Sequence, residues 1–401
     1  MHISMNCGRS RIDLDVADDR RPVRRHGPPP LADPAAAMRA ALRAPHDFPP
    51  LSAAVTADDH VAIVVDESLP DLAQLLTPVL EELAGVGIDP ANITLLCEPS
   101  ASGQPWLLDL PDAFEEVRLE VHDPKDRKKL SYLASTRQGR RLYLNRTAVD
   151  ADQSIVLSCL RYDSRLVRGA AVGALFPSLS DEATRAELNS RPNLDGPDAP
   201  AEQTALGEAM EAAWLLGAPF FIQVIESSED GAARVVAGAA AAVAEGRRAL
   251  DAAWRWNVPA LADVVVASLS GDPARQTFAD LAAAAACAAA VVQPDGRIIL
   301  LTEARPDLKA EAEELLRADD AGAVFDQLRR RPPLEQIPAL RWASAARRAR
   351  LSLLSALEDD AVEQIFATPL NEAAQVQRLL NAGGTSLFLE DAHRGWAVVA
   401  E

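Results

Sequence analysis

Lysine is nearly absent from this chain, and histidine is almost as scarce. Lys125, Lys128, Lys129 and Lys309 are the only lysines, so arginine supplies most of the 40 basic residues. The six histidines are scattered, and no two of them lie at a spacing that chelates a metal ion. The sequence pattern by itself therefore indicates no metal site.

Several sequence motifs are also missing, and each missing motif excludes a class of protein. The sequence contains no glycine-rich dinucleotide or Walker phosphate loop, no G-x-S-x-G nucleophile turn and no H-E-x-x-H zinc motif. Its four cysteines have no paired spacing, which excludes a disulfide framework and predicts reduced, mostly buried thiols. The common nucleotide-binding and hydrolase signatures are thus missing.

Charge and hydropathy exclude two classes of partner. A formal net charge of -19 argues against a nucleic-acid partner, because binding a phosphate backbone needs a concentrated basic surface. No apolar run is long enough to cross a bilayer, and the N-terminus lacks the basic-then-apolar plan of a secretory signal. We therefore expect a cytoplasmic protein without a membrane partner. Its oligomeric state does not follow from the sequence.

The arrangement of strands and helices predicts the fold class. A chain of 401 residues is too long for one hydrophobic core, which favours two domains. Short β-branched runs alternate with amphipathic helical stretches, a pattern typical of α/β proteins. We predict two α/β domains, each a mostly parallel sheet flanked by helices, with a cleft between them. The expected divisions are a strand and proline-rich segment over 1–32, a first domain over 33–258 and a second over 259–401.

The most informative stretch is HVAIVVDESLP, residues 60–70. Its apolar run predicts a strand buried on both faces of a parallel sheet. Ligands of such sheets bind beyond the carboxyl ends of the strands, which makes Asp66 and Ser68 candidate catalytic or binding residues. The alternative is a helix start, in which Ser68 is the N-cap and Asp71 is stabilised by the helix dipole.

His122 is a second candidate, at the end of a strand predicted over residues 117–122. Asp123 and Asp126 follow it closely, and a histidine beside carboxylates is suited to general-base or metal-binding roles. A lone histidine at a strand end is more often packed and hydrogen-bonded. Both interpretations stay open at this point.

The order of these segments resembles the nickel-dependent lactate racemase family (LarA-like proteins). In that family a buried strand leads into a D-x-x-T-R-P type motif. Asp66, Ser68 and Pro70 stand here at the Asp, Thr and Pro positions of that motif. The segments HDPKD, AVDADQSIVLS and GDPARQ also match the family, in order and at matching spacing.

The resemblance implies racemisation of a 2-hydroxy acid through a nickel-pincer nucleotide that is tethered to a lysine. One histidine would bind nickel, and two more would act as acid and base. This chain departs from that set: Leu69 replaces a carboxylate-binding arginine, and residues 98–103 replace a G-x-H-R type turn. A G-G-x-K segment should follow residue 158, yet no lysine lies between Lys129 and Lys309. The cofactor of this chain is therefore unknown.

The sequence leaves several functional hypotheses. One is a LarA-like lactate or 2-hydroxy-acid racemase with degenerate cofactor and acid/base residues, with Asp66, Ser68 and His122 as its candidate catalytic residues. Another is a non-catalytic protein on the same fold that binds a small carboxylate or has a regulatory role. A third is an enzyme that uses Asp66, Glu67 and His122 without nickel. Hydrogen removal at a carbinol carbon needs a base or a hydride acceptor, so chemistry favours the non-catalytic hypothesis.

Overall fold

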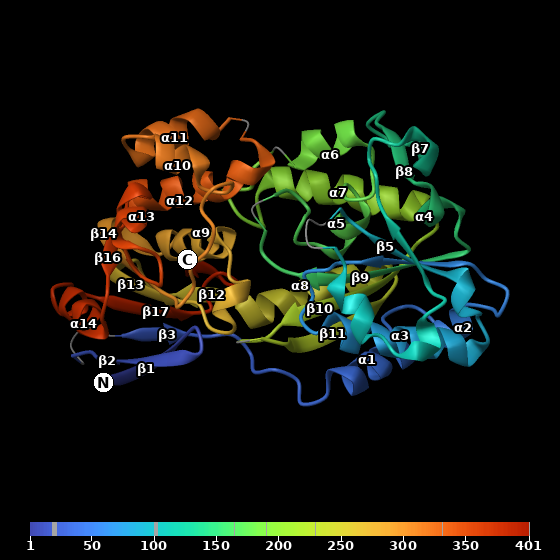
Figure 1. The fold of residues 1–401 in the computed structure, drawn as a ribbon, viewed down its shortest axis with the longest axis horizontal. Coiled ribbons are helices and arrows are strands. Elements are labelled where there is room, and N and C mark those ends of the chain that lie inside the picture. Colours follow the sequence, from blue (N-terminus) through green and yellow to red (C-terminus); the bar gives the residue numbers. More distant parts are fainter. Residues whose placement is uncertain are drawn as a thin grey trace.

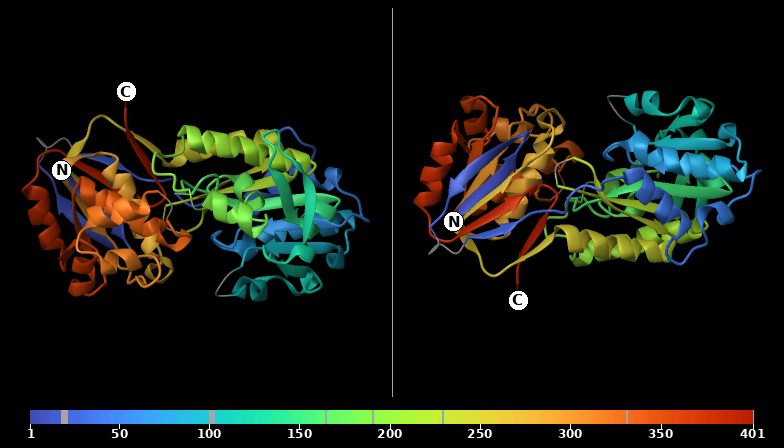
Figure 2. Two further views of the ribbon diagram at one scale, coloured as in Figure 1. Left: turned by 90° about the horizontal axis from the view of Figure 1, so that it is seen from above. Right: turned by 90° about the horizontal axis from the view of Figure 1, so that it is seen from below.

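The computed structural model describes residues 1–17, 22–99, 103–163, 165–189, 191–228, 230–330 and 332–400. Figure 1 shows an elongated molecule with two lobes, each built on a β-sheet against which helices pack. The views of Figure 2 show a narrower connection between the lobes. Both termini lie in the same lobe (Figure 1). The predicted α/β class with two mostly parallel sheets is confirmed.

The first lobe contains a six-stranded sheet in the order β11-β10-β9-β4-β5-β6. Its strands are β4 (Val61–Val65), β5 (Ile93–Cys97), β6 (Arg118–Val121), β9 (Gln153–Leu160), β10 (Phe220–Glu226) and β11 (Ala232–Gly238). All neighbours pair in parallel except β11, which runs antiparallel to β10. The stretch 61–65 is therefore a central strand, and its carboxyl end lies beside those of β5 and β9.

Burial on both faces explains the unbroken apolar run of β4. Val61, Ile63 and Val65 pack into one hydrophobic cluster, while Ala62 and Val64 point into another on the opposite face. The first cluster includes residues of α1 (Pro34–Arg43), α2 (Leu51–Ala54) and α3 (Leu72–Val86). The opposite face is covered by α4 (Arg146–Asp150), α5 (Ala171–Leu175), α6 (Glu182–Asn189), α7 (Pro200–Leu215) and α8 (Ala240–Trp254).

The second lobe contains an entirely parallel sheet in the order β16-β15-β14-β13-β17-β3. Its strands are β3 (Val23–Arg25), β13 (Ala262–Ser268), β14 (Val292–Leu301), β15 (Arg350–Leu354), β16 (Thr368–Leu370) and β17 (Ser386–Glu390). The helices of this part are α9 (Phe278–Ala289), α10 (Glu313–Arg317), α11 (Ala321–Leu328), α12 (Ile337–Arg348), α13 (Asp359–Gln364) and α14 (Ala373–Asn381). One face of the sheet packs against α9 and α12.

The N-terminal segment belongs to this second lobe in space. An antiparallel ribbon of β1 (His2–Cys7) and β2 (Ser10–Asp15) joins α14 in covering the other face of the second sheet. The remaining strands form two separate two-stranded sheets. In one, β7 (Leu130–Ser135) pairs with β8 (Arg141–Asn145), and in the other, β12 (Arg255–Val258) pairs with β18 (Trp396–Val399). The divisions expected at residues 32 and 258 stay predictions.

Local signals in the sequence account for several helix boundaries and mislead at one. The Asp33 carboxylate accepts a hydrogen bond from the backbone N–H of Ala36 (2.8 Å), as expected for the N-cap of α1. The stretch 148–152 has the acidic composition of a turn, yet its first three residues belong to α4. The Asn145 side chain caps this helix by accepting a hydrogen bond from the backbone N–H of Ala148.

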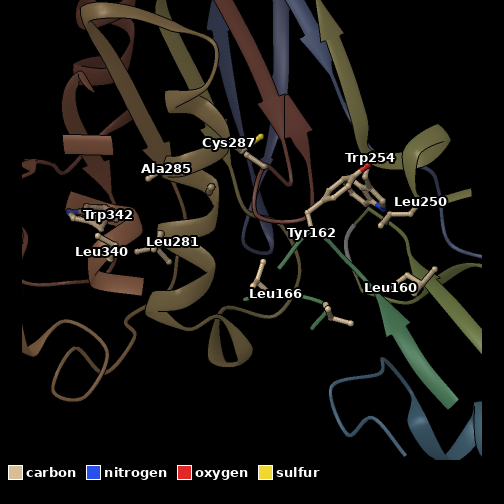
Figure 3. Packing of buried hydrophobic residues seen from close by; sticks show 14 of the residues in the cluster. Leu160, Tyr162, Leu166, Leu250, Trp254, Leu281, Ala285, Cys287, Leu340 and Trp342 are labelled. Atoms are coloured by element: carbon tan, nitrogen blue, oxygen red, sulfur yellow. The ribbon is translucent and has the colours of Figure 1, made fainter. Parts of the chain in front are cut away.

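A continuous buried cluster links the two lobes. Figure 3 shows Leu281 of α9 and Trp342 of α12 at one end of it, and Leu160, Tyr162 and Leu250 at the other. All four cysteines are free and buried, as predicted. Within the described ranges, no helix has the length and apolar character needed to cross a membrane.

Candidate functional site

A cavity of about 540 Å³ lies where the two lobes meet. Residues just beyond the carboxyl ends of β9 and β10 line it from the first lobe. The loops after β13 and β17, and the first turns of α9 and α12, line it from the second lobe. A crevice at the carboxyl ends of parallel strands is the usual ligand position in open α/β sheets. This cavity is the candidate site.

Ser68 lines the cavity, and Asp66 does not line it but contacts two of its lining residues, Ser68 and Arg161. The Asp66 carboxylate accepts hydrogen bonds from the Arg161 guanidinium (3.0 Å), from the backbone N–H of Cys159 (3.1 Å) and from Ser68. Ser68 is exposed and lines the cavity together with Arg161. Burial raises the pKa of Asp66, but Arg161 and these hydrogen bonds outweigh it, so the pKa lies below its ordinary value.

The helix-cap interpretation of Ser68 is wrong. The following helix begins at Leu72, with Asp71 as its N-cap residue, and the Ser68 side chain donates to Asp66. Leu69, at the position of the family's arginine, is buried among the apolar side chains between β4 and α3. Arg161, from the end of β9, brings a guanidinium to the Asp66 carboxylate from a different strand. The sequence marks Arg161 as a residue that could bind an anion or form a salt bridge, but it does not indicate that its partner is Asp66.

Arg165 and Asp163 form a second ion pair beside the first. The guanidinium donates to both carboxylate oxygens, at 2.9 and 2.7 Å. Burial raises the pKa of Asp163, but the charge and hydrogen bonds of Arg165 dominate and hold that pKa well below its usual range. The loop after β9 is thereby held rigid, with Arg161 and Arg165 each already neutralised by a carboxylate.

Gly169 closes this loop and leaves no room for a side chain. Its carbonyl accepts a hydrogen bond from the Arg161 backbone N–H, and an added Cβ would lie 2.0 Å from the Arg161 carbonyl oxygen. We expect Gly169→Ala to lower the free energy of unfolding by about 2 kcal/mol, because the backbone must shift. The matched control is Gly207→Ala in α7, where a Cβ meets nothing within 4 Å. The free energy of unfolding of this control should rise by up to about 1 kcal/mol. Urea denaturation measures both variants.

Arg341, on α12, differs from Arg161, Arg165 and Arg394, the paired arginines of the cavity. This residue is half-buried at the cavity wall, and no hydrogen bond or ion pair joins its side chain to any residue in the described ranges. Burial lowers its pKa, and the nearby Asp163 opposes this effect only from a distance, since that carboxylate is bound by Arg165. An arginine stays protonated even so, which leaves an uncompensated positive charge at this wall.

Carboxylates of the opposite wall are engaged by the protein itself. Asp280 forms a capping box with Thr277 at the start of α9, and Glu311 accepts from the Ala279 backbone N–H (2.9 Å). Burial raises the pKa of both carboxyls. Between the lobes, Arg394 lies 3.6 Å from the Glu226 carboxylate. These groups stabilise the cavity wall, and none of the described residues serves as a counter-ion for Arg341.

The two histidines near strand ends have different surroundings. His122 is buried away from the residues that line the cavity, with its Nε2 2.9 Å from the Ser180 carbonyl oxygen, and burial lowers its pKa. His393 lies on the cavity wall, and its Nδ1 is buried without a partner among the described residues. Burial, with Arg394 adding to it, lowers the pKa of His393 well below its usual value. The sequence analysis missed His393, which has no motif around it.

The lining residues do not fit the lysine-tethered nickel-pincer nucleotide expected from the family. Among the described residues that line the cavity there is no lysine, and His393 is the single histidine. Over the same ranges of the chain, no group of three or more His, Cys, Asp or Glu is placed to hold a metal ion. Of the segment that replaces the G-x-H-R turn, residues 100–102 lie outside the described part. Glu98 in that segment pairs with Arg168 and Arg185.

Comparison with known proteins gives the class of the fold. The structure matches the lactate racemase apoprotein of Thermoanaerobacterium thermosaccharolyticum over all of both chains, with a TM-score of 0.79 and 17% sequence identity. A protein of known structure from Thermotoga maritima matches with a TM-score of 0.61 and 8% identity, over 93% of this chain and 100% of that one. The two sheets and the cavity between them therefore define an α/β protein of the lactate racemase fold.

A family match makes the assignment more specific. Residues 7–184 match the model of the lactate racemase N-terminal domain family. No curated protein matches the chain in sequence. The resemblance seen in the sequence is confirmed over this part of the chain, and residues 7–184 are a LarA-like N-terminal domain.

Proposed function

We propose that this LarA-like protein binds a small carboxylate in the cavity between its lobes, without the nickel-pincer nucleotide of the family. The observation that carries the proposal is Arg341. A half-buried cation without a counter-ion among the described residues costs free energy, and a bound anion would lower that cost. The planar guanidinium also binds carboxylates through two parallel hydrogen bonds, which favours this class of ligand over other small molecules.

The surrounding residues suit a binding role. Asp66 and Asp163 hold Arg161 and Arg165 in place, so this wall needs little rearrangement when a ligand arrives. The exposed Ser68 hydroxyl lies at the same wall and can hydrogen-bond a second polar group, such as a 2-hydroxyl. A 2-hydroxy acid is therefore the first ligand class to test.

Racemisation of a 2-hydroxy acid is the second candidate function, and the family match over residues 7–184 favours it. It needs a group that takes hydrogen from the carbinol carbon and returns it to the other face. His393 is the neutral imidazole at the cavity wall, since burial lowers its pKa. Asp66 is a weak base there, because Arg161 and Ser68 stabilise its charged form.

One set of measurements separates the two functions. The purified full chain, produced with and without the nickel-cofactor maturation system, is assayed for bound nickel by mass spectrometry and for racemisation of D- and L-lactate. Binding of lactate and other 2-hydroxy acids is measured by titration calorimetry. We expect saturable binding, no stoichiometric nickel and no turnover. Stoichiometric nickel with turnover would overturn the cofactor-free proposal, and absence of binding to every acid would overturn the carboxylate site.

A further inference from the structure

A second cavity of about 410 Å³ adjoins the first. It lies between α7, α8 and the residues that follow β9, and the side chain of Trp396 closes part of it. Much of its lining is apolar: Leu160, Ala170, Ala171, Leu206, Met210, Val243, Leu250 and Trp396. Figure 3 shows Leu160 and Leu250 on this side of the buried cluster, near Tyr162.

Apart from Arg341, the charged residues that line this second cavity have partners within the protein, as two of them show. The Glu202 carboxylate accepts hydrogen bonds from the Val167 backbone N–H and from the Asn193 amide, at 3.0 and 3.1 Å. Arg247 is paired with Asp251 at 2.9 Å. These groups therefore need no charged ligand to balance them. The apolar side chains favour an apolar group in this cavity.

The two cavities share one wall. Arg161, Tyr162, Asp163, Arg165 and Arg341 line both of them. Of the three arginines, Arg161 and Arg165 are neutralised by Asp66 and Asp163, which leaves Arg341 at the junction as the charge without a partner in the described part of the chain. The Arg341 cation thus lies between the first cavity, which is polar, and the second, which is mostly apolar.

This arrangement favours a ligand that has a negatively charged end and an apolar end. We infer that the natural ligand is an amphipathic monocarboxylate, whose carboxylate binds Arg341 and whose alkyl chain lies in the apolar cavity between α7 and α8. The inference rests on the proposed carboxylate-binding function and names its ligand class. Cavities of roughly 300–1,000 Å³ hold ligands of drug size, so a three-carbon acid would leave most of this space empty.

The test is a series of 2-hydroxy acids of increasing chain length, from lactate through 2-hydroxybutyrate to 2-hydroxyhexanoate, titrated calorimetrically into the full chain. Each buried methylene should tighten binding about fourfold, which makes 2-hydroxyhexanoate about 60-fold tighter than lactate. Ala244→Phe fills the apolar cavity from an exposed position of α8. Ala252→Phe is the matched control, since Ala252 is also exposed on α8 but lines neither cavity.

Each outcome decides the inference. If Ala244→Phe abolishes the gain with chain length but still binds lactate, while Ala252→Phe behaves as the unmodified protein, the ligand class is supported. Equal affinity across the series would overturn the inference and leave the carboxylate site standing. A gain that persists in Ala244→Phe would also overturn it, because the chain would then lie elsewhere. Absence of binding to every acid would overturn the inference together with the proposed function.

Discussion

Arg341→Gln is expected to weaken carboxylate binding about 100-fold while leaving the fold intact. The guanidinium lines the cavity without an ion pair to any described residue, and losing a charged partner of a desolvated carboxylate costs about 2–5 kcal/mol. The same substitution removes a half-buried charge that no described residue neutralises, so the midpoint of thermal unfolding should be unchanged or higher. Binding is measured by titration calorimetry with 2-hydroxybutyrate, and stability by differential scanning calorimetry.

The control for this prediction comes from the same helix. Arg347 is exposed on α12, and its guanidinium lies 4.3 Å from the ring centroid of Phe325, away from the residues that line the cavity. Arg347→Gln should leave affinity unchanged and lower stability by about 0.5 kcal/mol. Equal loss of affinity in both variants would mean that general charge, and not the site, governs binding. Loss of stability in Arg341→Gln would mean that the arginine has a structural role.

Asp66→Ala is expected to lower the free energy of unfolding by about 3 kcal/mol. The substitution leaves the Arg161 guanidinium without its counter-ion and the backbone N–H of Cys159 without an acceptor, and unpaired groups of this kind are costly. Asp58→Ala, at an exposed position before β4, is the control and should change stability by less than about 0.5 kcal/mol. Urea denaturation at pH 7 measures both.

The loss of stability caused by Asp66→Ala should become smaller at acidic pH. The pKa of Asp66 is lowered in the folded protein, so its contribution is fully present above the pKa of the unfolded chain, about 3.9. Below that value the contribution is lost as the pH falls through the lowered pKa of the folded state. The difference between the variant and the unmodified protein should therefore be constant near neutrality and shrink below about pH 4. A difference that grows in acid would contradict the role of Arg161.

Much of the first lobe could be predicted because its signals are local. The apolar run 61–65 predicts a buried strand without reference to any distant residue, since only a strand covered on both faces accepts it. The Asp33 cap depends likewise on neighbouring residues alone. The ribbon of β1 and β2 shows the limit: whether that ribbon covers the first or the second sheet depends on contacts between residues hundreds of positions apart.

The sequence by itself determined the α/β class, the family resemblance, the strand that ends at Asp66 and the scarcity of lysine and histidine for a tethered nickel cofactor. Only the tertiary structure decided which charges face one another. Arg161 meets Asp66 from another strand, while Arg341 and His393, which carry no motif, reach the cavity from α12 and the loop after β17. The physical reason is that ion pairing depends on distances of a few ångströms, which are set by packing of whole elements and leave no periodic trace in the chain.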